Sequence, residues 1–150
     1  MTMASIPEVI AVATPQIGRE EGCRLTAYRD SRGIWTIGWG RADAGVTEGM
    51  TCTQAQADGW RDNKILQTAD QLEFHLPWWR TIGAARAAVL LEMAYQMGAG
   101  GLLAFDHALA AMQAGQWSAA AADMLNSDWA EQTPARAKRE ADQMRTGVAV

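Results

Sequence analysis

The stretch REEGCRLTAYRDSRGIWTIGWG, residues 19–40, decides the fold of the N-terminal part of the chain. Two runs rich in β-formers, 25–28 (LTAY) and 34–37 (IWTI), flank the turn-forming residues 30–33 (DSRG). This pattern predicts a β-hairpin with an aspartate in its turn. Gly22 stands just before the hairpin and is a candidate left-handed end for a preceding helix.

The residues on either side of this hairpin are typical of helices. Residues 5–8 (SIPE) form a capping box with proline in the first turn, so we expect a helix from there to about Glu21. Whether Pro15 interrupts this helix stays open. Residues 53–56 (TQAQ) form a second capping box, which begins a long helix that Pro77 must end.

The chain beyond residue 83 is predicted to be helical throughout. An apolar stripe at helical spacing predicts a helix over 83–97, which a cluster of glycines ends. Shorter helices are expected over 102–113, 118–125 and 134–146, the last with Thr133 as its N-cap. An α+β fold follows, with a small N-terminal lobe that holds a short antiparallel sheet. A long helix joins this lobe to a larger, all-helical C-terminal lobe.

Composition excludes several classes of function. The chain of 150 residues has a net charge of −4, and neither half has a basic excess, so we expect no nucleic-acid partner. Its one basic run, Arg136, Lys138 and Arg139, is interspersed with acids and is interpreted as a solvated helix face. Cys23 and Cys52 are too few for a disulfide framework and are expected to be free thiols. No zinc spacing is present, so no metal or cofactor is expected.

No signal peptide or transmembrane segment is predicted. The apolar run 9–13 lacks a preceding basic segment and is far shorter than the roughly 20 residues that span a bilayer. We therefore expect a protein that is made in the cytoplasm and does not insert stably into a membrane. If its substrate lies outside the cytoplasm, another agent must release it.

Glu21, Asp30 and Thr36 have the residue types and placement for hydrolysis of a glycosidic bond. That reaction needs a proton donor for the leaving oxygen and a second carboxylate that activates water or attacks directly. Glu21 stands at the expected C-terminal end of a helix, where the negative end of the dipole favours a protonated carboxyl, and is assigned as the general acid. Asp30 in the turn and Thr36 on the return strand would hold the attacking water. Each residue alone is common in a helix end, a turn or a strand; their conjunction points to hydrolysis.

The same stretch, 19–40, resembles the catalytic segment of the phage-type lysozymes (endolysins of the T-even and lambdoid phages, glycoside hydrolase family 24). In that family a glutamate before glycine, an aspartate in the hairpin turn and a threonine on the return strand form a catalytic triad. Glu21, Asp30 and Thr36 match this spacing. The resemblance extends from about residue 5 to 147 and includes the blocks 93–98 (MAYQMG), Trp117 with the alanine-rich segment after it, 127–129 (SDW) and 132–139 (QTPARAKR).

This resemblance implies one lysozyme-like catalytic domain over residues 1–150. Its N-terminal lobe would cover about 14–52, and its helical lobe about 53–150 together with the N-terminal helix. The implied activity is that of a bacteriolytic muramidase, an endolysin that hydrolyses the β-1,4 bond between N-acetylmuramic acid and N-acetylglucosamine in peptidoglycan and lyses the host cell. The implied partner is the glycan strand, and the enzyme would act as a monomer on the cell wall after a holin has opened the membrane.

By the same resemblance, substrate contacts would fall at Ala42, Tyr95, Ala108 and Asp123. Tyr95 suits a sugar face, whereas the other three differ from the residues of the T-even enzymes. The T-even members are inverting enzymes, which implies that Asp30 works through water.

Arg41 is a departure from the family next to the expected site. Most relatives continue the G-x-G turn with a histidine that pairs with an acid of the helical lobe. Arginine forms a permanently charged pair, and we expect Asp62 or Asp70 as its partner.

Two alternatives stay open at this point. A lytic transglycosylase would use Glu21 alone and form an anhydro sugar, which leaves Asp30 and Thr36 without a task. A non-catalytic lysis protein would bind the wall or disrupt the membrane. The net negative charge and the lack of a basic amphipathic helix argue against this second alternative.

Overall fold

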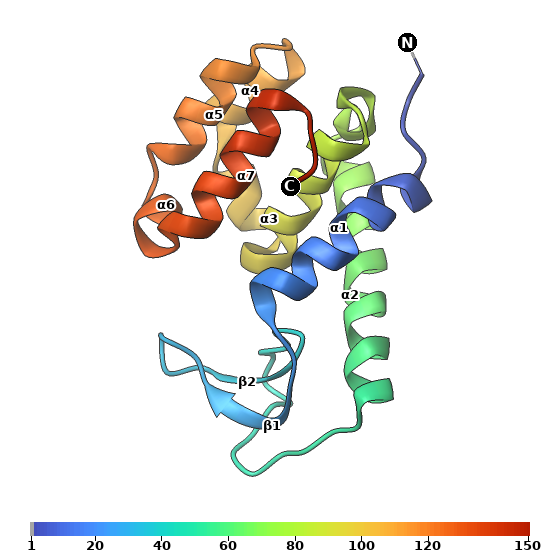
Figure 1. The fold of residues 1–150 in the computed structure, drawn as a ribbon, viewed down its shortest axis with the longest axis vertical. Helices are drawn as coiled ribbons and strands as arrows, with labels where there is room; N and C mark the ends of the chain where they lie inside the picture. Colours follow the sequence, from blue (N-terminus) through green and yellow to red (C-terminus); the bar gives the residue numbers. More distant parts are fainter. Residues whose placement is uncertain (1) are drawn as a thin grey trace.

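A computed structural model describes residues 2–150, and over these residues the chain forms seven α-helices, one 3-10 helix and one two-stranded antiparallel sheet. The sheet forms a small lobe at one end of the molecule, and α2 runs from beside it into a larger helical body (Figure 1). This arrangement confirms the predicted α+β fold. The elements in order are α1 (Ile6–Glu21), β1 (Arg24–Arg29), β2 (Trp35–Gly38), α2 (Gln54–His75), η1 (Trp79–Ile82), α3 (Ala84–Leu103), α4 (Asp106–Gln113), α5 (Trp117–Leu125), α6 (Asp128–Gln132) and α7 (Pro134–Thr146).

Helix α1 begins and ends where the sequence predicts. The Ser5 hydroxyl accepts a hydrogen bond from the Glu8 N–H (3.2 Å), and the Glu8 carboxylate accepts one from the Ser5 N–H (2.9 Å). Pro15 lies inside the helix without breaking it. Gly22 ends the helix with φ 65° and ψ 168°, which is extended rather than the left-handed helical conformation expected from the sequence. A positive φ with this ψ is accessible almost only to glycine.

The hairpin forms as predicted and sets the register of the small lobe. Tyr28 on β1 pairs with Thr36 on β2. In the turn, the Asp30 N–H donates to the Ile34 carbonyl and the Gly33 N–H donates to the Asp30 carbonyl, each at 2.9 Å. Gly33 has φ 78°, a conformation that side chains rarely adopt. The turn therefore holds Asp30 directly across the hairpin from the start of β2.

Helix α2 also has the predicted ends. The Thr53 hydroxyl accepts from the Gln56 N–H (3.1 Å), and the Gln56 side chain accepts from the Thr53 N–H (2.9 Å). The helix ends at His75, before Pro77. Because α2 packs against both β2 and α3, it joins the small lobe to the helical body.

The glycine cluster ends the first part of α3 as predicted, but α4 begins later than predicted. Segment α3 consists of two helices that meet at a kink at Gly98, whose φ of 79° and ψ of 161° are not helical, and the second helix continues to Leu103. Residues 102–103 therefore belong to α3, and α4 begins only at Asp106.

The C-terminal helices contain one element that the sequence analysis missed. The short helix α6 is capped by the Ser127 hydroxyl, which accepts from the Ala130 N–H at 3.1 Å. Helix α7 covers the predicted 134–146. Thr133 occupies its N-cap position, but its hydroxyl donates to the Trp129 carbonyl (2.9 Å) and makes no capping hydrogen bond to α7.

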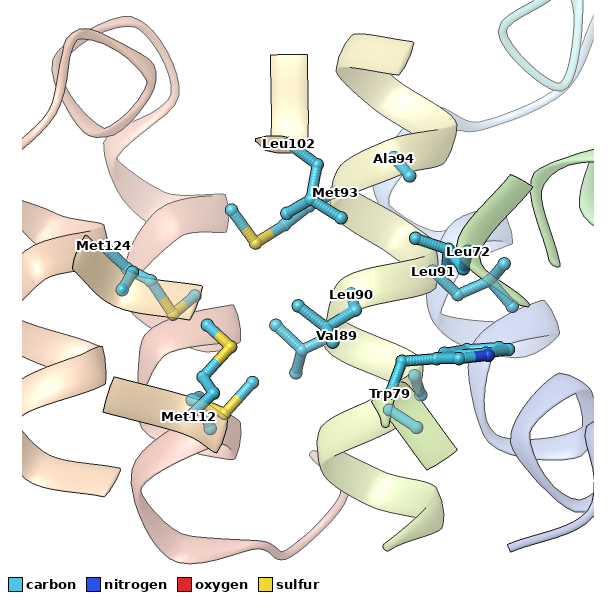
Figure 2. Packing of buried hydrophobic residues seen from close by; sticks show 14 of the residues in the cluster. Leu72, Trp79, Val89, Leu90, Leu91, Met93, Ala94, Leu102, Met112 and Met124 are labelled. Carbon is cyan, nitrogen blue, oxygen red and sulfur yellow. The ribbon is translucent and has the colours of Figure 1, made fainter. Parts of the chain in front are cut away.

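The hydrophobic core is built around α3. Val89, Leu90 and Leu91 are completely buried, with α1 and α2 packed on α3 and α7 also in contact with it. Figure 2 shows Met112 and Met124, from α4 and α5, extending into the same core. Within residues 2–150 no single helix is long and apolar enough to cross a bilayer. Helices α3 and α4 have the required length and apolar composition only when taken together, and this pair is bent by 103°.

A leucine inside this core and a leucine on the surface should contribute very differently to stability. Leu91 is 0% exposed, whereas Leu66 on α2 is 52% exposed. We expect Leu91→Ala to lower the free energy of unfolding by about 2–5 kcal/mol, since it removes buried methyl groups and leaves a cavity. Leu66→Ala should stay within about 0.5 kcal/mol. Urea unfolding followed by circular dichroism measures both, and equal losses would contradict this core.

Candidate active site

A cleft between the sheet lobe and the helical body brings the three predicted catalytic residues together. Its volume is about 660 Å³, and Glu21, Asp30 and Thr36 all line it. They come from the end of α1, the hairpin turn and β2. The cleft is closed on the helical side by residues of α2, α3, α6 and α7, including Lys64, Tyr95, Gln96, Gln132 and Arg136.

Glu21 is the last residue of α1 and is held on both sides. One carboxylate oxygen accepts a hydrogen bond from Arg136 Nη1 at 2.8 Å. The other lies against Gly40, where an added Cβ would come within 2.6 Å of it. Gly40 also has φ 86°, so both its backbone conformation and this close approach require glycine. The carboxyl group therefore has one fixed position between the two lobes.

The sequence interpretation of Arg136, Lys138 and Arg139 as one solvated face is wrong for Arg136. Its side chain is 8% exposed and lies in the cleft, whereas Lys138 is exposed and pairs with Asp142. Arg139 binds both carboxylate oxygens of Glu20, at 2.6 and 2.7 Å. The buried face of α7 that carries Arg136 also holds Ala137, Glu140, Ala141, Gln143 and Met144. That spacing is the signal by which the sequence could have revealed a buried arginine.

Asp30 uses one oxygen for the turn and leaves the other free. Its Oδ1 accepts hydrogen bonds from the N–H groups of Arg32 (2.8 Å) and Ile34 (2.9 Å). Its Oδ2 has no hydrogen-bond partner among residues 2–150. Two backbone donors stabilise the carboxylate and fix its rotamer, so the second oxygen is available to a molecule in the cleft.

Thr36 is only 5% exposed, and its hydroxyl proton is already committed. Its Oγ1 donates to the Ile34 carbonyl at 3.0 Å. A hydroxyl whose proton is engaged still has acceptor capacity. Thr36 can therefore accept a hydrogen bond from a water molecule but not easily donate one.

The four residues named as substrate contacts fall into two places. Ala42 and Tyr95 line the cleft with Glu21, whereas Ala108 and Asp123 line a separate cavity of about 420 Å³ between α4, α5 and α6. Tyr95 is 2% exposed, and its hydroxyl donates to the Trp39 carbonyl at 2.7 Å. The ammonium group of Lys64 lies over its ring at 4.1 Å, so this face is covered. Substrate contact at all four positions stays a prediction.

Arg41 does not pair with Asp62 or Asp70, and that prediction is wrong. Its Nε donates to Asp43 Oδ2 at 2.8 Å, and its guanidinium lies over the Trp60 ring at 4.4 Å from the centroid. The reason is local, because the Gly45 N–H binds Asp43 Oδ1 (2.8 Å) and holds this carboxylate beside Arg41 in the same loop.

Two acids, Glu92 and Glu140, are buried behind Arg136 and were missed by the sequence analysis. Arg136 Nε donates to Glu140 Oε2 at 2.9 Å, and its Nη2 donates to the Glu92 carbonyl at 3.3 Å. Burial, together with the charge of Glu140, raises the pKa of Glu92 to about 9. Burial also raises the pKa of Glu140 to about 7, although Arg136 opposes the change. One oxygen of each acid has no hydrogen-bond partner in the part of the chain that the structure describes.

The described residues were compared with the side-chain groupings that bind metal ions. In the described part of the chain, no three His, Cys, Asp or Glu side chains gather closely enough to hold a metal ion. Cys23 and Cys52 are free cysteines.

A cleft between a sheet lobe and a helical body that holds two carboxyl groups is the arrangement of a glycoside hydrolase of the lysozyme type. Comparison with known families agrees with this class. The family described as Phage lysozyme matches residues 18–142, and the chain therefore belongs to the phage lysozyme family.

Individual relatives cover the chain to different extents. The pre-baseplate central spike protein Gp5 of Enterobacteria phage T4 is 31% identical over an alignment of 145 positions, which covers 81% of this chain but only 25% of that protein. A probable T4-type lysozyme 1 of Dictyostelium discoideum is 24% identical over an alignment of 154 positions, which covers 86% of this chain and 91% of that protein. An endolysin of Lactococcus phage c2 is 60% identical over 40 residues, 25% of this chain and 17% of that protein.

The buried acid Glu92 should make stability depend on pH. Between its ordinary pKa of 4.5 and its folded value of about 9, the folded state keeps a proton that the unfolded state releases. The contribution of Glu92 to stability is therefore complete at low pH and is lost as the pH rises. In the wild type we expect the free energy of unfolding to fall between about pH 5 and about pH 8. In Glu92→Gln, which has no proton to lose at this position, this fall should be smaller by roughly 1–3 kcal/mol.

Urea unfolding at several pH values measures this effect. Glu131→Gln is the matched control, because Glu131 is exposed on α6. Parallel pH profiles for wild type and Glu92→Gln would contradict a proton held on Glu92.

Proposed function

We propose that the chain is an endolysin-type muramidase that hydrolyses the β-1,4 bond between N-acetylmuramic acid and N-acetylglucosamine in peptidoglycan. The observation that carries this proposal is the convergence of Glu21, Asp30 and Thr36 on one cleft. Its membership of the phage lysozyme family supports the same substrate class. Cleavage of the host wall in this way would lyse the cell.

Glu21 is the general acid in this proposal, and two opposing influences act on it. The C-terminal end of α1 disfavours a negative charge, whereas the hydrogen bond from Arg136 favours it. In the catalytic step the protonated carboxyl group of Glu21 would donate its proton to the leaving oxygen.

Asp30 and Thr36 would hold the attacking water. The free Asp30 Oδ2 can accept one water proton, and Thr36 Oγ1 can accept the other, which leaves a lone pair of the water for the anomeric carbon. Attack by water opposite the leaving group would invert the anomeric configuration. A transglycosylase needs no such pair, so the ordered geometry of both residues favours the hydrolase.

The remaining features of the proposal follow from the family. The protein would act as one catalytic domain and as a monomer, without a cofactor, on the glycan strand. The packing of α1 on α3 supports grouping the N-terminal helix with the helical lobe. Access to the wall would come after synthesis in the host cytoplasm, through a membrane lesion made by a holin.

Replacing Glu21 tests the proposal most simply. We expect Glu21→Gln to lower the rate of peptidoglycan hydrolysis by at least about 10²-fold, because the amide cannot donate a proton to the leaving oxygen. Its side chain can still accept the hydrogen bond from Arg136, so the fold should persist. Loss of turbidity of a peptidoglycan suspension measures the rate, and mass spectrometry identifies the products.

The adjacent Glu20 provides the matched comparison. Both of its oxygens are bound by Arg139, so Glu20→Gln should keep most of the activity. Products with ordinary reducing ends are expected. Anhydro sugars would identify a transglycosylase instead, and full activity of Glu21→Gln would rule out its role as the acid.

A further inference from the structure

A second cavity opens beside the catalytic cleft. Its volume is about 560 Å³, and it shares Ala42, Lys64 and Tyr95 with the cleft, so the two spaces adjoin. We call it the side cavity; its walls also include Trp39, Arg41 and Trp60.

The walls of the side cavity carry an excess of positive charge. Arg41, Arg61 and Lys64 line it, whereas Asp43 is the one acid among its lining residues. This local excess stands out in a chain with a net charge of −4. Each cation also lies over an aromatic ring, with distances to the ring centroid of 4.4 Å for Arg41 on Trp60, 5.3 Å for Arg61 on Trp39 and 4.1 Å for Lys64 on Tyr95.

Lys64 differs from the two arginines because it has no acidic partner. Arg41 pairs with Asp43 at 2.8 Å, and Arg61 pairs with Asp62 at 3.0 Å. Within residues 2–150, no carboxylate lies within 4.0 Å of the Lys64 ammonium group, and no hydrogen bond from it forms. Burial lowers the pKa of Lys64, although the charges of Glu21 and Asp43 partly offset this.

A partly buried ammonium group without a partner is unfavourable, since it has lost water and gained no anion. Its three N–H donors point to an occupant that can accept them with a negative charge. Because Lys64 lines both spaces, an anion bound to it could belong to a molecule that also fills the catalytic cleft.

We propose that the side cavity binds a carboxylate carried by the muramic acid residue of the glycan strand, with Lys64 as its direct partner. This inference rests on the proposed function. Of the two alternating sugars, only muramic acid bears a lactyl group, which ends in a carboxyl. That carboxyl is either free or joined to a peptide that carries carboxylates of its own. The rings of Trp39 and Trp60 provide apolar surface for the methyl groups beside either carboxylate.

Such a contact would fix the register of the strand in the cleft. A strand shifted by one sugar would place N-acetylglucosamine, which has no carboxylate, beside Lys64. The lysine would then lose its anion, and the catalytic carboxyl groups would face the wrong glycosidic bond. The side cavity would thus select which of the two alternating bonds is cleaved.

Equilibrium binding tests the contact without relying on catalysis. Calorimetry would compare N-acetylmuramic acid, muramyl dipeptide and N-acetylglucosamine as ligands of the Glu21→Gln protein. We expect Lys64→Gln in that background to weaken binding of a carboxylate-bearing ligand by about tenfold or more, because a charge-assisted hydrogen bond is lost. Binding of N-acetylglucosamine should not change, and Lys64→Arg should restore most of the affinity.

Lys138→Gln is the matched control, because it removes the same charge from an exposed position on α7. Weakened binding of N-acetylmuramic acid would identify the lactyl carboxylate as the ligand. An effect confined to muramyl dipeptide would identify a carboxylate of the peptide. The proposal is overturned if Lys64→Gln weakens all three ligands equally or none of them, or if no carboxylate-bearing ligand binds.

Kinetics on the active protein separate this proposal from the proposed function. Lys64→Gln should raise KM for glycan strands by about tenfold, whereas the exposed control Lys138→Gln should leave KM unchanged. Inactivity of the wild type on every glycan would refute the proposed function, while the binding experiment would still decide the carboxylate contact.

Discussion

The ion pair between Glu21 and Arg136 is the contact on which the architecture of the site depends. It joins the last residue of α1 to the first turn of α7, across 115 positions of sequence, at 2.8 Å. Arg136 is also bound to Glu140 and to the backbone at Glu92, so the guanidinium is fixed from three sides. Gly40 from the sheet lobe then closes against the other oxygen of Glu21. The two lobes therefore meet at one carboxyl group.

This arrangement carries a cost that the rest of the fold must offset. Removing charged groups from water is unfavourable unless they are well paired, and Glu92 and Glu140 each keep one unpartnered oxygen. The raised pKa of Glu92 resolves part of the conflict, because a protonated Glu92 adds no charge beside Glu140. The buried helix α3, which carries Glu92, supplies the apolar packing that holds these groups together.

The sequence predicted features whose causes lie within a few residues of each other. The capping boxes at Ser5 and Thr53 and the hairpin turn at Asp30 all depend on such local hydrogen bonds. It did not predict the burial of Arg136, or the position of Lys64 over Tyr95, because these depend on which distant segments meet. The pairing of Arg41 with Asp43 was missed for a different reason. The expected partners, Asp62 or Asp70, were inferred from the pairing in relatives. In this chain Arg41 instead forms its ion pair with Asp43, two residues away in the same loop.

A double-mutant cycle on Glu21 and Arg136 tests this account most directly. The free energy of unfolding would be measured at neutral pH for wild type, Glu21→Ala, Arg136→Ala and the double variant, because alanine at either position removes the hydrogen bond between them. If the pair organises the site, the two changes will be strongly non-additive, with a coupling energy of at least about 1 kcal/mol. A coupling near zero, with losses that simply add, would show that Arg136 does not hold Glu21 and would contradict the account.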